Sequence, residues 1–576
     1  MTGLPDLTTL LYRADWTQLS LTGELIRRVD RAALGLRHAP SERHADPAGR
    51  HPADAGAPPQ WQETTGSVLV APGGRFRVAN PARHDGPDVT VCDGESCWRL
   101  LGDWAERREA GLGDPALAQL LDPSWLLAGY VLAETGTIDS GGRTAYCVTA
   151  TPRPAGRRGK LPDRVDVLVD AELGILLRLE ARNGGRLVET AALESVAVHP
   201  DHVLDLTQFS PPPGTTPTDP GAAVADFGQL RGPLGQVVGT AADLTANALG
   251  FAVRHAPRPA ETAPPPPMPV AAAEAEMAST DPLSNAEIKL LHRSGLPGQD
   301  FAAEVRTWMD REILMERAQR MRSSMRQPLT GVLGPDAVWA ALAERAAGVD
   351  YRTARLRVAA PGRYRIDYLA GNWQSKLTTA CDGEHTQTLY SNRVVTGPAE
   401  PLDDDWALLA DPAWLLLSDW QLSAAGEAVV DGRPGLVLRA DAQPGPDRPV
   451  LYSPGWYPPD LHPSRGTTQF DRVTVVVDRE LGIILRYTGY LDDRPAVCSE
   501  LHEVQPCTAT DPAEFTAQVP PGTRVVEGSS PLAHLDLRRP VEAAKAAGAI
   551  GMAGAAIVSG WLQNRPGRRQ DSSRDR

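Results

Sequence analysis

Lysine, cysteine and aromatic residues are rare in this chain. Only four of its 58 basic residues are lysine, and aromatic residues make up 5% of the 576 residues. Acidic residues outnumber basic ones by 72 to 58, giving a formal net charge of -14. No overall field therefore draws the molecule to a phosphate backbone, and we expect no nucleic-acid partner. Six cysteines are too few for a disulfide scaffold and indicate a reducing compartment.

Common catalytic and metal-binding motifs are also missing. The patterns G-x-S-x-G, H-E-x-x-H, G-x-x-x-x-G-K-[ST] and G-x-G-x-x-G do not occur, and the twelve histidines show no ligand spacing. We therefore expect a protein that is not an enzyme and that uses no metal or cofactor. Cys92 and Cys97 permit a bridge or a metal pair, but the absence of any C-x-x-C spacing favours buried thiols.

Neither end of the sequence carries a clear targeting segment. The first thirty residues lack a basic stretch followed by an unbroken apolar one, so we expect a cytoplasmic protein. Residues 546–562 run without a charge and precede Arg565, Arg568 and Arg569, which suggests a peripheral membrane contact through residues 540–562. The alternative is a packed helix of small residues. The Ala and Gly content of the segment, and Asp243 in the corresponding segment of the first half, favour this alternative.

The chain does contain an internal duplication. Residues 163–178 recur at 471–486 with twelve of sixteen positions identical, where chance would give about one match. Four shorter segments repeat in the same order, namely 72–77 with 361–365, 92–95 with 381–384, 122–127 with 411–416, and 212–215 with 520–523. The Pro- and Ala-rich stretch between the copies is typical of an extended linker. We expect one module at about 1–255, a linker over 256–281, and a second module at 282–576.

The repeated block has the pattern of a β-hairpin. Val165, Val167 and Val169 fall on one face of a predicted strand and the residues between them on the other, and a glycine-containing turn follows. Helical patterns occur over 115–121, 124–132, 233–253, 337–347, 406–420 and 540–562. Residues 285–326 are also helical in pattern, although the matching residues 19–26 look like a strand. Each module is therefore predicted to be α+β, an antiparallel sheet with helices on one face.

The order of these segments resembles a known superfamily. In the first copy, strand-like residues 66–77 precede an Asp93-Gly94 turn and Trp98, followed by a leucine-rich helical stretch, the hairpin and residues 209–214. This order is similar to that of the lipoprotein-carrier superfamily, which includes LolA-like periplasmic carriers, RseB-like regulators and LppX-like lipid-binding lipoproteins. The resemblance covers most of residues 16–215 and, less completely, 303–525. Family members are exported, and this chain differs from them in showing no signal peptide.

What the resemblance implies is a fold and a class of function. It implies a half-barrel of about eleven antiparallel strands, with helices forming a lid over an apolar cavity, and it brings no catalytic residues. Two such half-barrels in tandem would hold a lipid or another apolar group, as a carrier or a sensor. The alternative, which the RseB-like resemblance allows, is a regulatory module with filled cores that binds a protein partner.

The candidate ligand residues are large apolar side chains on the expected strands and helix starts. Two segments, 125–127 and 414–416, each follow an Asp-Pro pair that would cap a helix start. These side chains either line a cavity or fill it. The candidates are Phe76, Trp98, Trp125, Leu126, Leu127, Tyr364, Trp414, Leu415 and Leu416.

Two further sets of polar residues are expected to have structural roles. Asp93-Gly94 and Asp382-Gly383 read as hairpin turns rather than metal or catalytic acids. Four arginines are expected on the solvated face of the sheets, with contact to an anionic headgroup as the alternative. These arginines are Arg75, Arg77, Arg363 and Arg365.

Overall fold

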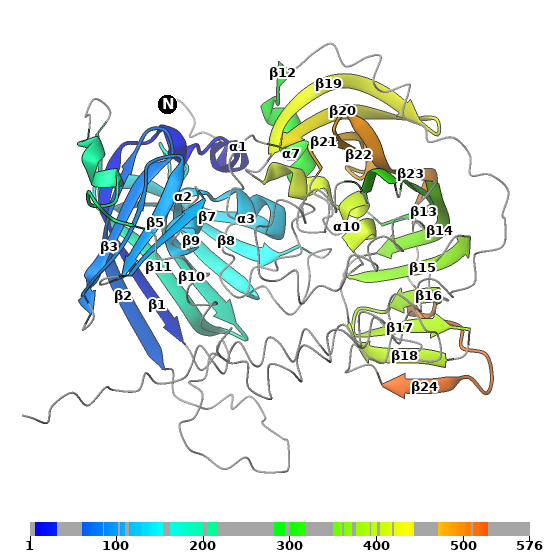
Figure 1. Cartoon of the computed structure of the whole chain (residues 1–576). Coiled ribbons are helices and arrows are strands. Elements are labelled where there is room, and N and C mark those ends of the chain that lie inside the picture. The colour runs from blue at the N-terminus through cyan, green and yellow to red at the C-terminus, as the bar shows by residue number, and fades with distance from the viewer. Residues whose placement is uncertain are drawn as a thin grey trace, which may run out of the picture.

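The structure is a computed structural model in which the chain forms two large curved antiparallel sheets, each with a few short helices (Figure 1). We call residues 6–216 module 1 and residues 281–527 module 2. The predicted α+β class with two half-barrel sheets is confirmed. The residues described are 6–30, 60–83, 86–101, 104–109, 115–153, 162–199, 204–216, 281–293, 300–310, 312–314, 316, 349–359, 362–370, 376–391, 393–399, 402, 404–417, 420–442, 470–507 and 511–527. The predicted module end at residue 255 lies outside them, so the predicted domain limits stay predictions.

Module 1 contains an eleven-stranded sheet in the order β6-β5-β4-β3-β2-β1-β11-β10-β9-β8-β7. Among the described residues the edge strands β6 and β7 do not pair, so the sheet is an open half-barrel. Its strands are β1 (Leu21–Asp30), β2 (Trp61–Ala71), β3 (Arg75–Arg83), β4 (Gly86–Cys92), β5 (Ser96–Leu101), β6 (Trp104–Glu109), β7 (Tyr130–Ser140), β8 (Arg143–Pro152), β9 (Arg164–Asp170), β10 (Leu176–Asn183) and β11 (Arg186–Val198). Its helical elements are α1 (Leu7–Tyr12), η1 (Trp16–Gln18), α2 (Pro115–Leu121), α3 (Ser124–Gly129) and η2 (Leu206–Phe209).

Module 2 repeats this strand order from β13 to β23 and adds one short strand at each edge, β12 beside β19 and β24 beside β18. Its strands are β12 (Asp281–Pro282), β13 (Phe301–Asp310), β14 (Val349–Ala359), β15 (Arg363–Ala370), β16 (Lys376–Cys381), β17 (His385–Tyr390), β18 (Arg393–Pro398), β19 (Trp420–Val430), β20 (Arg433–Ala442), β21 (Arg472–Asp478), β22 (Ile484–Leu491), β23 (Arg494–Pro506) and β24 (Arg524–Glu527). Its helical elements are α7 (Asn285–Arg293), α10 (Asp404–Ala410), η5 (Pro412–Leu416) and η7 (Pro512–Phe515).

Several helix predictions need correction. The helix predicted over 124–132 ends at Gly129, because β7 begins at the next residue. The helix predicted over 406–420 is two elements, α10 and η5, since Pro412 lacks the N–H that would continue α10. The helix predicted over 285–326 is wrong over residues 301–310, which form β13, paired with both β14 and β23, although residues 312–314 are helical. The helix over 115–121 is confirmed, and those over 233–253, 337–347 and 540–562 lie outside the described residues.

The predicted hairpin is present in both modules, with a buried acid at its turn. In β9 the side chains of Val165, Val167 and Val169 are buried. Asp170 at the end of β9 accepts hydrogen bonds from two backbone N–H groups of the turn and is ion-paired with Arg143. These bonds lower the pKa of Asp170 overall, although burial alone would raise it.

The same arrangement recurs at the β21–β22 turn. There Asp478 accepts from the backbone N–H groups of Glu480 and Leu481, each at 2.8 Å, and pairs with Arg433 at 2.6 Å. The pKa of Asp478 is likewise lowered despite its burial. The two halves of the sequence therefore repeat a polar contact as well as a strand pattern.

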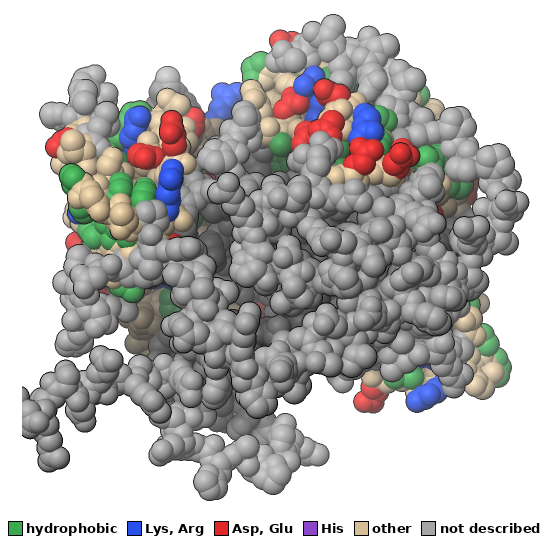
Figure 2. All heavy atoms as spheres, viewed as in Figure 1, with side chains coloured by type: hydrophobic (Ala, Val, Ile, Leu, Met, Phe, Trp, Pro, Cys, Tyr) green, Lys and Arg blue, Asp and Glu red, His purple; other side chains and the backbone are tan. Residues whose placement is uncertain are grey.

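The helices lie on the inner side of the sheets, between the two modules. Figure 1 shows α1 and α3 of module 1 facing α7 and α10 of module 2 across this region, and α1 packs on α7 while α3 packs on η5. One buried apolar cluster runs through both modules. Figure 2 shows that acidic and basic side chains lie beside each other on the described surface of module 2, where Arg479 pairs with Glu427. This part of the surface is a solvated, mixed-charge face.

Candidate apolar ligand site

The candidate site of module 1 is built on the two short helices α2 and α3. Asp122, between them, accepts a hydrogen bond at 3.2 Å from the backbone N–H of Ser124, the first residue of α3. The indole Nε1 of Trp125 donates to the backbone carbonyl of Gln119 at 3.1 Å. With its polar atom satisfied, Trp125 is buried, as are the next two leucines of the segment. The Asp-Pro pair is thus a helix start, as the sequence indicates.

Module 2 builds the same arrangement 289 residues later. Asp411 accepts from the backbone N–H of Ala413 at 3.1 Å, and Trp414 Nε1 donates to the carbonyl of Leu408 at 3.2 Å. The element that follows Asp411 is a 3-10 helix rather than an α-helix. Its apolar residues are still fully enclosed, since all of residues 412–416 are buried.

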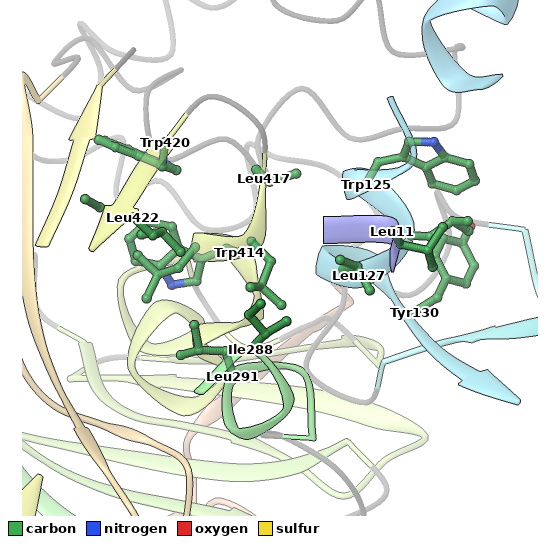
Figure 3. Packing of buried hydrophobic residues seen from close by; sticks show 14 of the residues in the cluster. Leu11, Trp125, Leu127, Tyr130, Ile288, Leu291, Trp414, Leu417, Trp420 and Leu422 are labelled. Carbon is green, nitrogen blue, oxygen red and sulfur yellow. The ribbon is translucent and has the colours of Figure 1, made fainter. Parts of the chain in front are cut away.

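Each tryptophan stands edge-on to an aromatic residue at the start of the next strand (Figure 3). Trp125 contacts Tyr130 of β7 with ring centroids 5.7 Å apart and an interplanar angle of 84°. Trp414 contacts Trp420 of β19 at 6.2 Å and 73°. Edge-to-face contacts of this kind add to the stabilisation from burial alone. The two pairs fix where each helical segment joins its sheet.

Eight of the nine candidates belong to the one apolar cluster that spans both modules. Phe76 and Tyr364 reach it from the sheets, where they are 0% and 4% exposed. Trp98 is half-buried, lies outside the cluster and has the guanidinium of Arg107 5.7 Å from its ring. The structure thus brings together all the predicted site residues except Trp98.

An ion pair joins the two modules at this site. Arg153 follows β8, is 1% exposed and donates to Asp411 twice, from Nε at 2.7 Å and from an Nη at 3.1 Å. It also donates to the backbone carbonyl of Tyr130 at 3.4 Å. Asp411 therefore holds η5 through its cap and module 1 through Arg153. The sequence carries no signal for this pair, because 258 residues separate its members.

His292 of α7 lies beside this ion pair. Burial and the charge of Arg153 lower the pKa of His292 to about 4, while its hydrogen bond to the Tyr130 carbonyl opposes the shift. His292 is neutral at pH 7 for this reason. Its Nε2 is buried and has no hydrogen-bond partner. A protonated His292 would place a second positive charge beside the buried guanidinium of Arg153, so the neutral imidazole is favoured.

Solvated contacts complete the junction between α1 and α7. Lys289 of α7 pairs with Asp6 at 2.7 Å, and Arg13 donates to Asn285 at 3.1 Å. Burial raises the pKa of Asp6, but its bonds to Lys289 and Thr9 lower it overall. These contacts are partly or fully exposed, so each contributes little compared with the buried pair.

The turns and arginines predicted from the sequence have structural partners. Asp93 accepts from the two backbone N–H groups that follow Gly94. Gly94 has a φ of +97°, and a Cβ added there would lie 2.5 Å from the carbonyl oxygen of Gly73, so the turn requires glycine. Arg77 and Arg365 each donate to a backbone carbonyl beside η2 and η7, at 3.4 and 3.2 Å. These residues therefore brace turns and short 3-10 helices.

Asp382 has the same role in module 2 as Asp93 has in module 1. It accepts from the backbone N–H groups of Glu384 and His385 at 2.8 and 2.7 Å. These bonds lower its pKa overall, although burial raises it. Arg75 donates to the carbonyl of Pro72, and the guanidinium of Arg363 lies 5.3 Å from the ring of Phe515.

The described residues also bear on the cysteines and on metals. None of the six cysteines is in a disulfide, and Cys92 and Cys97 lie opposite each other in the β4–β5 hairpin as buried thiols. Burial raises the pKa of Cys498 to about 12. Within the described ranges no group of three or more metal-ligating side chains occurs, and no helix there is long and apolar enough to cross a membrane.

Comparison with known proteins gives matches in structure only. No protein-family model matches the chain, and no curated protein is similar to it in sequence. MucB of the Pseudomonas aeruginosa MucA/MucB complex is 16% identical over 36% of this chain and 60% of its own, with a TM-score of 0.21. A LolA superfamily protein from Nitrosomonas europaea is 10% identical over 37% of this chain and 99% of its own, with a TM-score of 0.19.

A third match is the lipoprotein LppX of Mycobacterium tuberculosis. It is 13% identical over 35% of this chain and 99% of its own, with a TM-score of 0.20. LolA-like and LppX-like proteins are among the groups that the order of the sequence segments resembles. The likeness concerns the fold, and the site described above rests on the contacts within this chain.

Proposed function

We propose that this protein is a non-enzymatic carrier or sensor that holds a lipid acyl chain, or another apolar group, between each curved sheet and its short helices. The observation that carries the proposal is the repeated lid. In both modules a Trp-Leu-Leu segment is buried against the inner side of a half-barrel, and an aspartate accepts a backbone N–H at the start of the segment. We use "lid" for α2 with α3 in module 1 and for α10 with η5 in module 2.

The lids are suited to displacement by an acyl chain. Each helical element has five to seven residues, a length at which a helix has little stability of its own. What holds the lids are apolar contacts, such as those of Leu126 and Leu415, which are both fully buried. An acyl chain that replaces a lid side chain restores the same kind of contact, at about 25 cal/mol per Å² of buried apolar surface.

Mass spectrometry of gently purified full-length protein tests the proposal. We expect co-purified lipid, and we expect the delipidated protein to bind a fluorescent fatty acyl probe. The matched variant is Asp122→Ala, which removes the hydrogen bond at the start of α3, loosens the lid of module 1 and should bind the probe faster. Absence of lipid together with no probe binding by either protein would contradict carriage.

A second function is favoured by the low exposure of the candidates. Apart from Trp98, they are at most 5% exposed, as expected if the half-barrels are filled by their own side chains. In that case the protein would be a regulatory module that binds a protein partner. Cavities of several hundred Å³ in the delipidated protein would favour carriage, since ligand sites have that size. Solid cores would favour the regulatory module.

A further inference from the structure

Gln119 is out of place in the lid of module 1. It lies in α2 among Ala118, Leu120 and Leu121, all of which are 0–1% exposed, and is itself 5% exposed. Neither its amide nitrogen nor its amide oxygen has a hydrogen-bond partner. Nearly all buried polar groups in folded proteins are hydrogen-bonded, so a buried side-chain amide with both atoms unpaired calls for a partner from outside the chain.

Module 2 shows that the lid does not need this amide. The residue at the same place in α10 is Leu408, because Trp125 donates to the carbonyl of Gln119 just as Trp414 donates to that of Leu408. In each case the indole donates to a backbone carbonyl, so this hydrogen bond does not depend on which side chain stands at the position. The lid is therefore built equally well with leucine at this position, and the amide of Gln119 serves something other than the lid.

We propose that the lid site of module 1 selects a lipid whose polar end both donates and accepts a hydrogen bond, a fatty acid or fatty amide, and that Gln119 binds this end. This inference rests on the proposed function. A primary amide or a protonated carboxyl group pairs with a carboxamide through two hydrogen bonds at once, which satisfies both unpaired atoms of Gln119. The fatty acid binds in its neutral form, because burial strongly disfavours an unpaired carboxylate.

Beside the lid of module 2 lies another buried polar atom, and its chemistry is different. Trp420, which follows the lid there, has a buried indole Nε1 without a hydrogen-bond partner. An indole N–H only donates, so it suits an acceptor such as an ester oxygen. The two modules therefore differ in the headgroup they take, and module 1 is the one that requires a donor on the lipid.

Binding of chain-matched lipids to the delipidated full-length protein tests this inference. Hexadecanamide and methyl hexadecanoate have the same alkyl chain length, but the ester lacks the donor. We expect one amide-selective site, with a preference of about tenfold, the ratio for one hydrogen bond to a buried neutral group. Gln119→Met should abolish that preference while retention of the methyl ester persists. Gln505→Met, at an exposed position of β23 away from both lids, should leave the preference unchanged.

The outcomes separate the two proposals. Equal preference in the wild type and Gln119→Met, with lipid retained by both, would overturn the role of Gln119 and leave lipid carriage standing. Retention of neither lipid would overturn the proposed function itself. Gln119→Leu, which copies module 2, provides a second variant, and thermal unfolding of both empty variants checks folding. Both should unfold at a higher temperature than the wild type, because they remove two unpaired polar atoms from the interior.

Discussion

The buried ion pair between Arg153 and Asp411 should control how firmly the two lids are held together. Its two hydrogen bonds measure 2.7 and 3.1 Å, and the two side chains are 1% and 9% exposed. Removing one member of such a pair leaves an unpaired buried charge, which costs about 3–5 kcal/mol. We therefore expect Arg153→Met and Asp411→Asn each to destabilise the junction by about 3 kcal/mol.

A double-mutant cycle makes this prediction specific. Replacing both residues, by Arg153→Met and Asp411→Asn, leaves no charge unpaired, so the double variant should lose much less than the sum of the two single losses. The assay is amide hydrogen exchange in α3 and η5, which reports the free energy of local opening. Arg28→Met is the control, since Arg28 pairs with Glu63 on the surface and is 55% exposed. Additive losses, or unchanged exchange in η5 of the single variants, would refute the reasoning.

Four further outcomes are expected. The pKa of His292 is about 4 in the folded protein, so on acidification the unfolded chain binds a proton at this histidine before the folded protein does. The free energy of unfolding should therefore fall by about 3 kcal/mol as the pH drops from 6.5 to 4. Urea unfolding of His292→Phe should lack this part of the fall. The lowered pKa of Asp170 adds stability above about pH 4 that is lost at lower pH, so Asp170→Asn should cost about 2 kcal/mol at pH 7 and converge with wild type in acid. Leu126→Ala, at a fully buried site, should cost about 3 kcal/mol in unfolding and increase retention of the acyl probe, whereas unchanged retention would favour filled cores. Cell fractionation should give the same soluble fraction for the full chain and for a chain ending before Pro540 if residues 540–562 form a packed helix, whereas less membrane association of the shorter chain would favour the membrane contact; recovery of either in the culture supernatant would contradict the expected cytoplasmic location.

The sequence predicts the strands well where local pattern and pairing agree. Val165, Val167 and Val169 alternate with residues that face the other side of β9, and the structure buries all three. The prediction fails at β13, where Ala, Glu, Arg and Met are all good helix formers. Pairing with β14 on one side and β23 on the other overrides that propensity, because a central strand gains hydrogen bonds and burial on both sides.

The contacts between modules were beyond the reach of sequence patterns. The Asp-Pro pairs and the Trp-Leu-Leu segments identify both lids, but nothing in them indicates that α3 packs on η5. Arg153 has no counterpart in any motif, and its partner is fixed only by the way the two sheets meet. Gln119 is visible in the sequence as the one polar residue of the predicted helix over 115–121, at the position that Leu408 has in the second copy.

The most direct test of lid displacement is hydrogen exchange of the delipidated protein with and without a bound acyl lipid. Amides of residues 124–129 and 413–416 should exchange faster when lipid is bound, while the β9–β10 turn at Asp170, away from the lids, keeps its protection. Lipid binding that leaves exchange in α3 and η5 unchanged would contradict the account, because the acyl chain would then lie somewhere other than beneath the lids.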